Sequence, residues 1–457
     1  MKEVPMALYK AFVKFVTYPL ISRYEGLGGV YRHLRELEEQ QYLPEHTLQE
    51  LQWLKLQGML RYAYDNTAYY RMKFDEYGIR PEDVKDPSDM VRVPILTKED
   101  MITHKDLMIS REYSPSSLVP SYSGGTSGIK VNFFYARDCL AYKRAATLRC
   151  ERWTGWDIGD RTVLVWPANQ DHNSGLSLKE KIKEQLFTRW TMCPAAKMDE
   201  PVIRDHIRTI ITTRPGLIRG FPTPLGILAE YILQNSIVIP SPCSIISTGE
   251  PLFRPQRERI EKAFGGRVFD SYGAREVSLI GQECEHHNGY HINMECNFLE
   301  FIKDGRQAEP GEVSDMVITD LVNHGMPLIR YSISDQGAPS DRTCGCGRGL
   351  RLFESIVGRD NDVLKSTRGS SVFPSALIMF MIEEGPEIGK MRIVQDRPDH
   401  LKVQIAGSPR PGQDHFAFYR GTIRELFGGD MNVDFELLED LPNEKSGKFR
   451  FTVYDVK

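Results

Sequence analysis

The sequence predicts a large α/β domain with parallel β-sheets, preceded by a helical extension and followed by a small α+β domain. Three observations lead to this fold class. Apolar residues recur at helical spacing through residues 1–110, short apolar runs then alternate with helical stretches, and the last part of the chain reads as strand, strand, helix and strand. Alternating strands and helices are typical of a parallel sheet covered by helices on both faces.

Length, composition and charge exclude several classes of protein. The chain has 457 residues, which suggests about two to four domains, and 41% of them are hydrophobic, enough for a large core. A formal net charge of −4 gives no support to a nucleic-acid-binding surface. Eight cysteines are too sparse in a chain of this length for a disulfide framework.

No segment reads as a membrane span or a cleaved signal peptide, and we expect a cytoplasmic protein. The best candidate, residues 6–21, holds two lysines and a proline and is too short and too charged to cross about 30 Å of hydrocarbon. It reads as an amphipathic helix packed on the body of the protein. The alternative is peripheral contact with a membrane through an apolar face that includes Phe12, Phe15 and Val16.

The helical extension is predicted to cover residues 1–110. Its apolar residues recur with few helix breakers between them, at Leu48, Leu51, Leu54, Leu60 and Tyr62. After the Pro94-Ile95-Leu96 run, Thr97 followed by Asp100 predicts a capped helix, with Thr97 as its N-cap.

The α/β part follows. Buried strands are predicted at 163–166, 216–220, 244–248 and 268–270, with helices at 203–213, 224–233 and 255–264 between them. Strands at 298–302 and 312–319 come next, and the small domain has strands at 391–395, 401–405 and 432–438 and a helix at 413–426. We therefore divide the chain into residues 1–357 and a smaller domain at 358–457.

A loop at residues 121–130, Ser-Tyr-Ser-Gly-Gly-Thr-Ser-Gly-Ile-Lys, has the composition of an anion-binding site. Glycines allow the backbone N–H groups to approach an anion closely, while hydroxyls add donors and Lys130 adds charge. By composition alone, a loop of this kind is more often a plain connection between strands. The loop also differs from the G-x-x-x-x-G-K-[ST] pattern, because Ile129 follows Gly128 and Val131 follows Lys130.

The order of the following motifs resembles that of the adenylate-forming superfamily of acyl-CoA synthetases, adenylation domains and luciferases. The 121–130 loop resembles its phosphate loop, residues 270–276 its Tyr-Gly-x-x-Glu segment, and residues 328–335 its Tyr-Arg-Thr-Gly-Asp segment. Residues 358–365 resemble its Gly-Arg-x-Asp-Asp hinge, and Ser446-Gly447-Lys448 its C-terminal lysine loop. The chain looks most like the phenylacetate–CoA ligase-like branch, which includes proteins named for capsule biosynthesis (CapK-like).

The resemblance implies a role for each matching residue. Lys448 would stabilise charge on the α-phosphate, Glu276 would hold magnesium, and Thr126 would bind phosphate. Asp335 would accept hydrogen bonds from the ribose hydroxyls, a task that suits the two oxygens of a carboxylate, and Tyr272 would stack on adenine. The remaining implied ATP-binding positions are Ser123, Gly124, Gly125, Ser127, Gly128, Lys130, Gly249, Glu250, Ser271, Gly273, Arg359 and Lys365.

The sequence departs from the family pattern in three places. The arginine of Tyr-Arg-Thr-Gly-Asp falls at Ser332, its glycine at Ser334, and the first hinge aspartate at Asn361. Asparagine still supports a turn, so hinging at this position is retained, whereas Ser332 loses one polar contact.

A cysteine and histidine cluster predicts a structural zinc site. Zinc prefers thiolate and imidazole ligands, and four of them close a site. The candidates are Cys284, His291, Cys344 and Cys346, with His286 or His287 as alternatives to His291. Related ligase-like proteins carry a similar Cys-His-Cys-x-Cys set. The remaining cysteines are expected to be buried thiols, namely Cys139, Cys150, Cys193, Cys243 and Cys296.

The resemblance implies ATP-dependent activation of a carboxylic acid to its adenylate, with release of pyrophosphate, followed by transfer to a thiol, most simply that of coenzyme A. Two alternatives stay open: transfer to an amine or hydroxyl, and a catalytically silent nucleotide-binding protein of a polysaccharide pathway. The expected cofactors are ATP, Mg²⁺, coenzyme A and structural Zn²⁺. The acid is not identified, and homodimerisation is left open; Trp166, Asn169, His172 and Phe221 follow strands that could border the acyl pocket.

Overall fold

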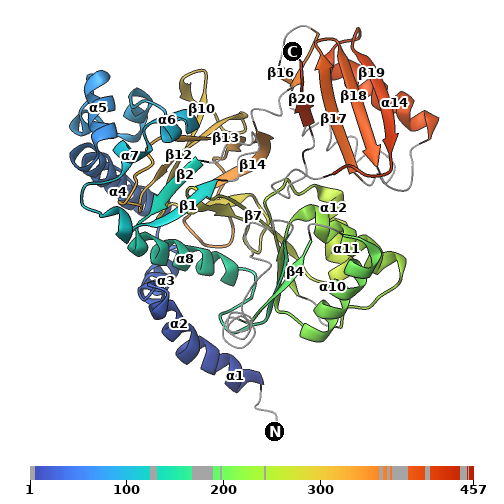
Figure 1. Ribbon diagram of the computed structural model, residues 1–457, viewed down its shortest axis with the longest axis horizontal. Coiled ribbons are helices and arrows are strands. Elements are labelled where there is room, and N and C mark those ends of the chain that lie inside the picture. Colours follow the sequence, from blue (N-terminus) through green and yellow to red (C-terminus); the bar gives the residue numbers. More distant parts are fainter. Residues whose placement is uncertain are drawn as a thin grey trace.

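The computed structural model describes residues 6–123, 131–166, 189–195, 198–240, 243–359, 364–367, 371–372, 390–406, 412–442, 450 and 452–456. Its centre is a twelve-stranded sheet with the order β11-β10-β12-β13-β14-β9-β8-β7-β6-β5-β3-β4. A smaller four-stranded part carries the C-terminal residues and lies apart at the upper right of Figure 1.

One half of the large sheet is parallel. Its strands are β3 (Thr162–Trp166), β4 (Trp190–Pro194), β5 (Leu217–Gly220), β6 (Ser244–Thr248) and β7 (Val268–Ala274). The pleat sends successive side chains to opposite faces: Ile245 joins one core cluster and Ile246 another. Helices cover both faces, as an all-buried parallel sheet requires.

Each face has its own helices. The face of Ile245 packs against α10 (Glu200–Thr213), α11 (Pro222–Gln234) and α12 (Arg254–Phe264), to the right of β4 and β7 in Figure 1. The face of Ile246 packs against α3 (Val30–Gln40) and α8 (Arg137–Arg152). Apolar residues at helical spacing, such as Ile203, Ile207 and Ile210 of α10, supply these contacts.

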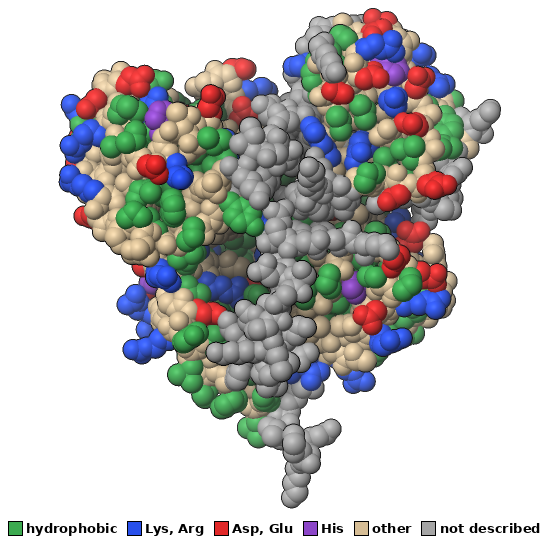
Figure 2. Space-filling view, in the orientation of Figure 1, with side chains coloured by type: hydrophobic (Ala, Val, Ile, Leu, Met, Phe, Trp, Pro, Cys, Tyr) green, Lys and Arg blue, Asp and Glu red, His purple; other side chains and the backbone are tan. Residues whose placement is uncertain are grey.

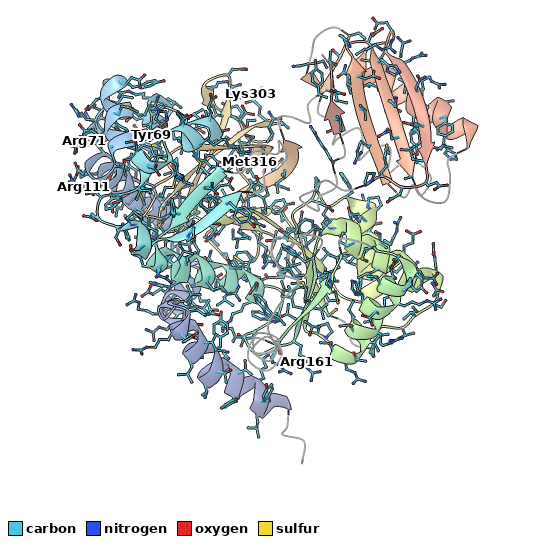
Figure 3. The ribbon with its side chains drawn as sticks, in the orientation of Figure 1. Tyr69, Arg71, Arg111, Arg161, Lys303 and Met316 are labelled. Carbon is cyan, nitrogen blue, oxygen red and sulfur yellow. The ribbon has the colours of Figure 1, made fainter. Side chains whose placement is uncertain are left out.

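The other half of the sheet is antiparallel. It is made of β8 (Ser278–Gln282), β9 (Tyr290–Ile292), β10 (Asn297–Lys303), β11 (Arg306–Gln307), β12 (Ser314–Asp320), β13 (Tyr331–Pro339) and β14 (Leu352–Arg359). Met316 of β12 is fully buried in the largest core cluster, on the side of the molecule where Tyr69 also lies, whereas Arg161 lies at the far lower edge (Figure 3).

The N-terminal helices pack on this half. They are α4 (Glu45–Asn66), α5 (Ala68–Glu76), α6 (Lys98–Thr103) and α7 (Lys105–Met108), with 3₁₀ turns at Pro81–Asp83, Pro87–Arg92 and Pro115–Ser117. Ahead of them, α1 (Met6–Phe12), a π-helical turn η1 (Val13–Thr17) and α2 (Tyr18–Tyr24) run without a break. A hairpin of β1 (Val119–Ser123) and β2 (Val131–Tyr135) connects the extension to α8.

The C-terminal part has the strand order β19-β18-β17-β20. Its elements are β15 (Leu364–Lys365), β16 (Ser371–Val372), β17 (Lys390–Arg397), β18 (His400–Ala406), α14 (Gln413–Phe427), β19 (Asn432–Leu438) and β20 (Thr452–Tyr454). Tyr419, Ile423 and Phe427 of α14 pack on this sheet. Phe253, from the segment just before α12, joins the same core and so ties the two parts together.

The predicted fold class is confirmed, with one difference. The predicted strands at 163–166, 244–248 and 432–438 and the helices at 255–264 and 413–426 agree with the structure to within a residue or so at each end. Thr97 caps α6 as predicted, since its side chain accepts the N–H of Asp100 and the Asp100 carboxylate accepts that of Thr97. The sheet, however, is parallel only as far as β7, because β8 turns back in a tight hairpin. The division at residue 357 stays a prediction.

Two glycine variants test the packing. At Gly266 a Cβ atom would lie 1.7 Å from the carbonyl oxygen of Cys243, which is backbone and cannot swing aside. We expect Gly266→Ala to lower the free energy of unfolding by more than about 3 kcal/mol. In the matched control, Gly58→Ala, the new methyl group on α4 meets nothing within 4 Å and should stabilise the helix by about 0.5–1 kcal/mol. Denaturant unfolding of both variants measures the difference, and equal stabilities would contradict it.

Candidate active site and metal centre

The predicted site residues gather where the parallel half of the sheet meets the antiparallel half. Phe221, Gly249 and Glu250 follow the carboxyl ends of β5 and β6, and Tyr272 lies near the end of β7. Asp335 comes from β13, across the antiparallel half. The carboxyl ends of parallel strands open on one edge of a sheet, which is where α/β proteins place ligands.

Two hydrogen bonds link the β7 segment to the β13 segment, and each segment donates one of them from a tyrosine to a carboxylate of the other. We call this pair of hydrogen bonds the reciprocal exchange. The Tyr272 hydroxyl donates to Oδ2 of Asp335 over 2.6 Å, and the Tyr331 hydroxyl donates to Oε1 of Glu276 over 3.0 Å. Each segment thus contributes one tyrosine and, four residues later, one carboxylate. Tyr331 and Glu276 are both buried. The two predicted acids, far apart in sequence, are therefore held by the same pair of segments.

The β7 segment reaches this geometry through a tight turn. Pairing between β7 and β8 shifts register between Tyr272 and Gly273. A Cβ at Gly273 would lie 2.6 Å from the carbonyl oxygen of Ser278, so only glycine fits, and Ser278 itself has a φ of 67°. The turn aims Tyr272 and Glu276 toward β13.

The β13 segment has two left-handed residues. Arg330 has a φ of 50° and Ser334 a φ of 60°. Ser334 stands where the resembled motif has glycine, and its backbone keeps the conformation that glycine favours. Arg330 offers no replacement for the arginine absent at Ser332, because it is buried, donates to Glu300 over 3.1 Å and also contacts the carbonyl of Val93.

The phosphate-loop prediction falls mostly outside the described residues. Gly124, Gly125, Thr126, Ser127, Gly128 and Lys130 lie there, as does Lys448, and the side chain of Ser123 is likewise not described. The ends of the loop are described: Ser123 pairs with Val131 in the β1–β2 hairpin. Next to Ser123, Tyr122 lies 5.4 Å from the guanidinium of Arg275, and Tyr135 donates to the carbonyl of Arg275. The β1–β2 hairpin that flanks the loop therefore contacts Arg275 of the 270–276 segment.

Gly249 and Glu250 are fixed by α11. Gly249 has a φ of 85°, and a Cβ there would lie 2.7 Å from the ring of Phe221. The buried Glu250 carboxylate accepts the N–H of Thr223 at the start of α11, where the helix dipole favours negative charge. Trp166 meets the Phe221 ring edge-on, with centroids 4.8 Å apart. Asn169 and His172 lie outside the described residues.

Two more predicted residues lie toward the C-terminal part. Arg359 stands directly opposite Asp335 in the β13–β14 ladder, and its side chain is not described. Lys365 is exposed on β15, where its backbone N–H and carbonyl bond the side chain of Gln395. The predicted hinge residue Asn361 lies outside the described residues.

Asp270 and Ser271, which precede Tyr272, are buried. Burial, together with the charge of Glu283, raises the pKa of Asp270 to about 7. Its carboxylate accepts from the Tyr290 hydroxyl over 2.5 Å, and the Tyr290 ring stacks on Phe353. Tyr272 packs edge-on against the same Phe353, so this buried group supports the ring that reaches Asp335.

The predicted zinc ligands form one compact cluster. The ligand atoms of Cys284, His291, Cys344 and Cys346 all lie within 4.8 Å of one another. The two sulfurs of Cys284 and Cys344 are 3.6 Å apart, and Sγ of Cys346 is 3.4 Å from Nε2 of His291. A tetrahedron with zinc–ligand distances of about 2.0–2.3 Å has edges of about 3.3–3.8 Å, and these two separations lie in that range.

The surroundings prepare this cluster for a metal. Nδ1 of His291 donates to the carbonyl of Leu350 over 3.1 Å, which leaves Nε2 as the ring nitrogen available to a metal ion. Burial, opposed in part by that hydrogen bond, lowers the pKa of His291 to about 4 and keeps the ring neutral. Burial alone would raise the pKa of Cys346, but hydrogen bonds from Arg348 outweigh it and lower the pKa.

The alternative histidines do not join the cluster. Nδ1 of His287 lies 3.2 Å from the Glu283 carboxylate, and the ring packs on Phe269. The backbone N–H of His286 donates to Sγ of Cys284 over 3.4 Å. All eight cysteines lie within the described residues and are free thiols, and the five expected to be bystanders are buried.

Sequence reasoning gave Tyr331 no role, although the structure places it on Glu276. The signal was present, since Tyr331 precedes Asp335 by the same four residues that separate Tyr272 from Glu276. Tyr290 and Phe353 were missed as well, and no local pattern marks them because their part depends on packing between distant strands.

Removal of one hydroxyl tests the reciprocal exchange. We expect Tyr331→Phe to lower the free energy of unfolding by about 1–3 kcal/mol, because the ring keeps its buried place while the Glu276 carboxylate loses a donor. In the matched control, Tyr64→Phe, a hydroxyl that donates to Asp75 over the same 3.0 Å but at an exposed site is removed, at a cost below about 0.5 kcal/mol. Equal losses in urea unfolding would contradict the assignment.

Cysteine replacement tests the metal centre. Wild-type protein should carry about one zinc per chain by elemental mass spectrometry, and Cys344→Ser should carry almost none and melt at least about 5 °C lower. Cys193→Ser, at a buried cysteine far from the cluster in sequence, should retain the metal. A wild-type protein that neither contains zinc nor is stabilised by added zinc would refute the site.

Comparisons with known proteins agree with this geometry. Residues 364–455 match the family model of the CapK C-terminal domain. The chain is 25% identical to phenylacetate-coenzyme A ligase of Thermus thermophilus over 80% of its length and 84% of the relative. It is 22% identical to protein CapK of Staphylococcus aureus over 89% of each chain.

Among solved structures, 2-hydroxyisobutyryl-CoA ligase in complex with 2-HIB-AMP in the postadenylation state gives a TM-score of 0.72 at 20% identity, with 90% of each chain covered. The same enzyme with 2-HIB-AMP and CoA in the thioesterification state gives 0.58 at 20% identity, over 91% of this chain and 92% of that one. The chain is thus similar in sequence to phenylacetate–CoA ligases and to protein CapK, its residues 364–455 match the CapK C-terminal domain, and it has the fold of adenylate-forming CoA ligases.

Proposed function

We propose that this protein is an AMP-forming ligase that activates a carboxylic acid with ATP and transfers the acyl group to the thiol of coenzyme A. The observation that carries the proposal is the reciprocal exchange of Tyr272 with Asp335 and Tyr331 with Glu276. It brings two carboxylates, Asp335 for the ribose and Glu276 for magnesium, to the same edge of the sheet. The named relatives, the phenylacetate-coenzyme A ligases, support the class of reaction.

The first half-reaction joins two anions. A carboxylate oxygen of the acid attacks the α-phosphorus of ATP, and pyrophosphate leaves. The loop at residues 124–130 holds the β- and γ-phosphates through hydroxyls, backbone N–H groups and the charge of Lys130. Asp335 accepts hydrogen bonds from the ribose, and the donor from Tyr272 keeps its carboxylate oriented.

Glu276 is the proposed magnesium ligand. Magnesium prefers oxygen ligands and binds with few protein carboxylates in sites that also hold phosphates, and the ion neutralises charge that develops there. The Glu276 carboxylate fits this donor requirement: Tyr331 occupies Oε1, and the second oxygen is free of any hydrogen bond among those described. Tyr331 is therefore a positioning residue for this carboxylate.

The second half-reaction needs the C-terminal part to move. Lys448 belongs to that part and acts on the α-phosphate during adenylate formation. Rotation about Asn361 then replaces the lysine loop by another face that admits the thiol, a hinge transition between two packed arrangements.

The zinc centre is proposed as a structural staple. Cys284 follows β8, the partner of β7, while Cys344 and Cys346 follow β13. A four-ligand zinc site has no open position and serves to hold segments together. Zinc at this place would fix the distance between the segments that carry Tyr272 and Asp335. All eight cysteines lie in the described residues and none forms a disulfide, which supports a reducing, cytoplasmic setting; homodimerisation stays a prediction.

Lysine replacement tests the activity. We expect Lys448→Ala to reduce ATP–pyrophosphate exchange by about 10²–10³-fold, because a charge that stabilises the transition state is lost, while the melting temperature is unchanged. Lys303→Ala, at an exposed lysine paired with Glu312, is the control and should keep the wild-type rate. A panel of aliphatic and aromatic acids, with CoA present or absent, identifies the acid and the acceptor.

Three outcomes of the same assay count against parts of the proposal. Amide or ester products without CoA consumption would show that the acyl acceptor is an amine or a hydroxyl and not the thiol of CoA. ATP binding with no exchange for any acid would indicate a silent nucleotide-binding protein. ATP–pyrophosphate exchange at the wild-type rate by Lys448→Ala would show that Lys448 has no role in adenylate formation.

A further inference from the structure

Arg275 is a cation in the middle of the candidate site. It lies between Tyr272 and Glu276, in the turn that joins β7 to β8, and its side chain is partly exposed. The motifs assign roles to the tyrosine and the glutamate on either side and none to the arginine. Figure 2 shows Lys and Arg side chains in a hollow beside the residues drawn in grey, in the part of the view where Figure 1 places β1 and β7.

The β1–β2 hairpin holds Arg275 from two sides. Tyr135 of β2 donates to the carbonyl of Arg275 and so fixes its backbone. The guanidinium lies 5.4 Å from the centre of the Tyr122 ring, a cation–π contact with the end of β1. Tyr122 precedes Ser123, the last residue of β1, after which the predicted phosphate loop begins. The guanidinium is therefore held against the strand that leads into that loop.

The two segments of the reciprocal exchange offer little positive charge to an anion. Ser332 stands where the resembled motif has arginine. Besides Arg275, the β7 and β13 segments contain one other cation, Arg330. Its side chain is buried and donates to Glu300 over 3.1 Å. Arg275, which is partly exposed, is therefore the cation of these segments that an anionic ligand reaches.

A guanidinium suits a polyphosphate ligand. Its planar fork of N–H groups binds two oxygens of one phosphate at a time, and it stays charged throughout the physiological pH range. A cation–π contact uses no hydrogen-bond acceptor, so Tyr122 supports the guanidinium without requiring its N–H groups. Adenylate formation also needs positive charge at the phosphates, because the carboxylate and ATP are both anions.

The neighbours of Arg275 indicate which anion it meets. Glu276, the next residue, is the proposed magnesium ligand, and magnesium in such sites binds phosphate oxygens. The β1 strand beside the guanidinium leads into the loop proposed to hold the β- and γ-phosphates. Both neighbours favour the phosphates of ATP over the carboxylate of the acid.

We propose that Arg275 is a phosphate-binding residue, which holds ATP through its guanidinium and supplies positive charge that the β13 segment lacks at Ser332. The inference rests on the proposed function, since it takes ATP as the ligand. Loss of this residue weakens the binding of the phosphates and leaves the binding of the nucleoside unchanged.

Calorimetric titration of the full-length protein with ATP and Mg²⁺, in the absence of any acid, tests the proposal. Arg275→Gln should weaken ATP binding at least about tenfold, because charge-assisted hydrogen bonds are lost. Arg275→Lys keeps the charge without the planar fork, and its affinity for ATP should lie between those of the wild type and Arg275→Gln. Adenosine, which has no phosphate, should bind the wild type and Arg275→Gln equally. Both variants should keep the wild-type melting temperature, because the side chain is partly exposed.

The matched control loses the same kind of contact far from the site. Arg71 lies 5.3 Å from the Tyr64 ring, at the outer edge of the molecule in Figure 3, and Arg71→Gln should leave the affinity for ATP unchanged. Unchanged ATP affinity in Arg275→Gln, or an equal loss for ATP and adenosine, would overturn the proposal. So would normal ATP binding with a raised KM for the acid in ATP–pyrophosphate exchange, because the guanidinium would then hold the acid.

The same titration separates this proposal from the proposed function. ATP binding that weakens in Arg275→Gln, in a protein whose wild type activates no acid, would support the role of Arg275 and contradict the ligase activity. A wild-type protein that binds no ATP would refute both.

Discussion

The candidate site depends on one exchange of hydrogen bonds, in which Tyr272 reaches Asp335 and Tyr331 reaches Glu276. Each carboxylate accepts a hydrogen bond from the tyrosine of the opposite segment, so a displacement of β13 against β7 disturbs both acids together. Buried hydrogen bonds to charged groups are among the stronger polar interactions in proteins, and they are directional. The exchange therefore fixes the orientation of each carboxylate as well as its distance from the tyrosine that donates to it.

Other features of the fold serve this constraint. The register shift at Gly273 aims one tyrosine, the left-handed residues of β13 aim the other, and the Cys-His cluster joins the strands behind them. The sheet changes from parallel to antiparallel at β7, which lets segments distant in sequence meet at one edge. In a purely parallel sheet, each pair of neighbouring strands needs a long crossover connection, whereas antiparallel strands can be joined by a short turn.

The sequence was sufficient to predict the helices and strands, but not the contacts between segments that are distant in sequence. Apolar runs and helical periodicity predicted β6 and α12 closely, because burial of those residues is dictated by neighbours a few positions away. The antiparallel return at β8 was not predicted, since the turn is made by Ser278 in a backbone conformation that serine rarely adopts. Likewise, motif order located Glu276 and Asp335, but the tyrosine that orients each one comes from another strand. The functional roles of both acids stay predictions.

Phe253 has a consequence for movement of the C-terminal part. Its ring is nearly fully buried in the core formed by Leu364, Met391 and Tyr419, and it stands only three residues beyond Glu250. Any rotation that withdraws the C-terminal part must first expose this ring to water, at a cost of about 2 kcal/mol unless new apolar contacts replace the old ones. The burial of this ring thereby favours the resting orientation. Because that side chain shares a short loop with Gly249 and Glu250, a ligand that shifts the loop also shifts the balance between orientations.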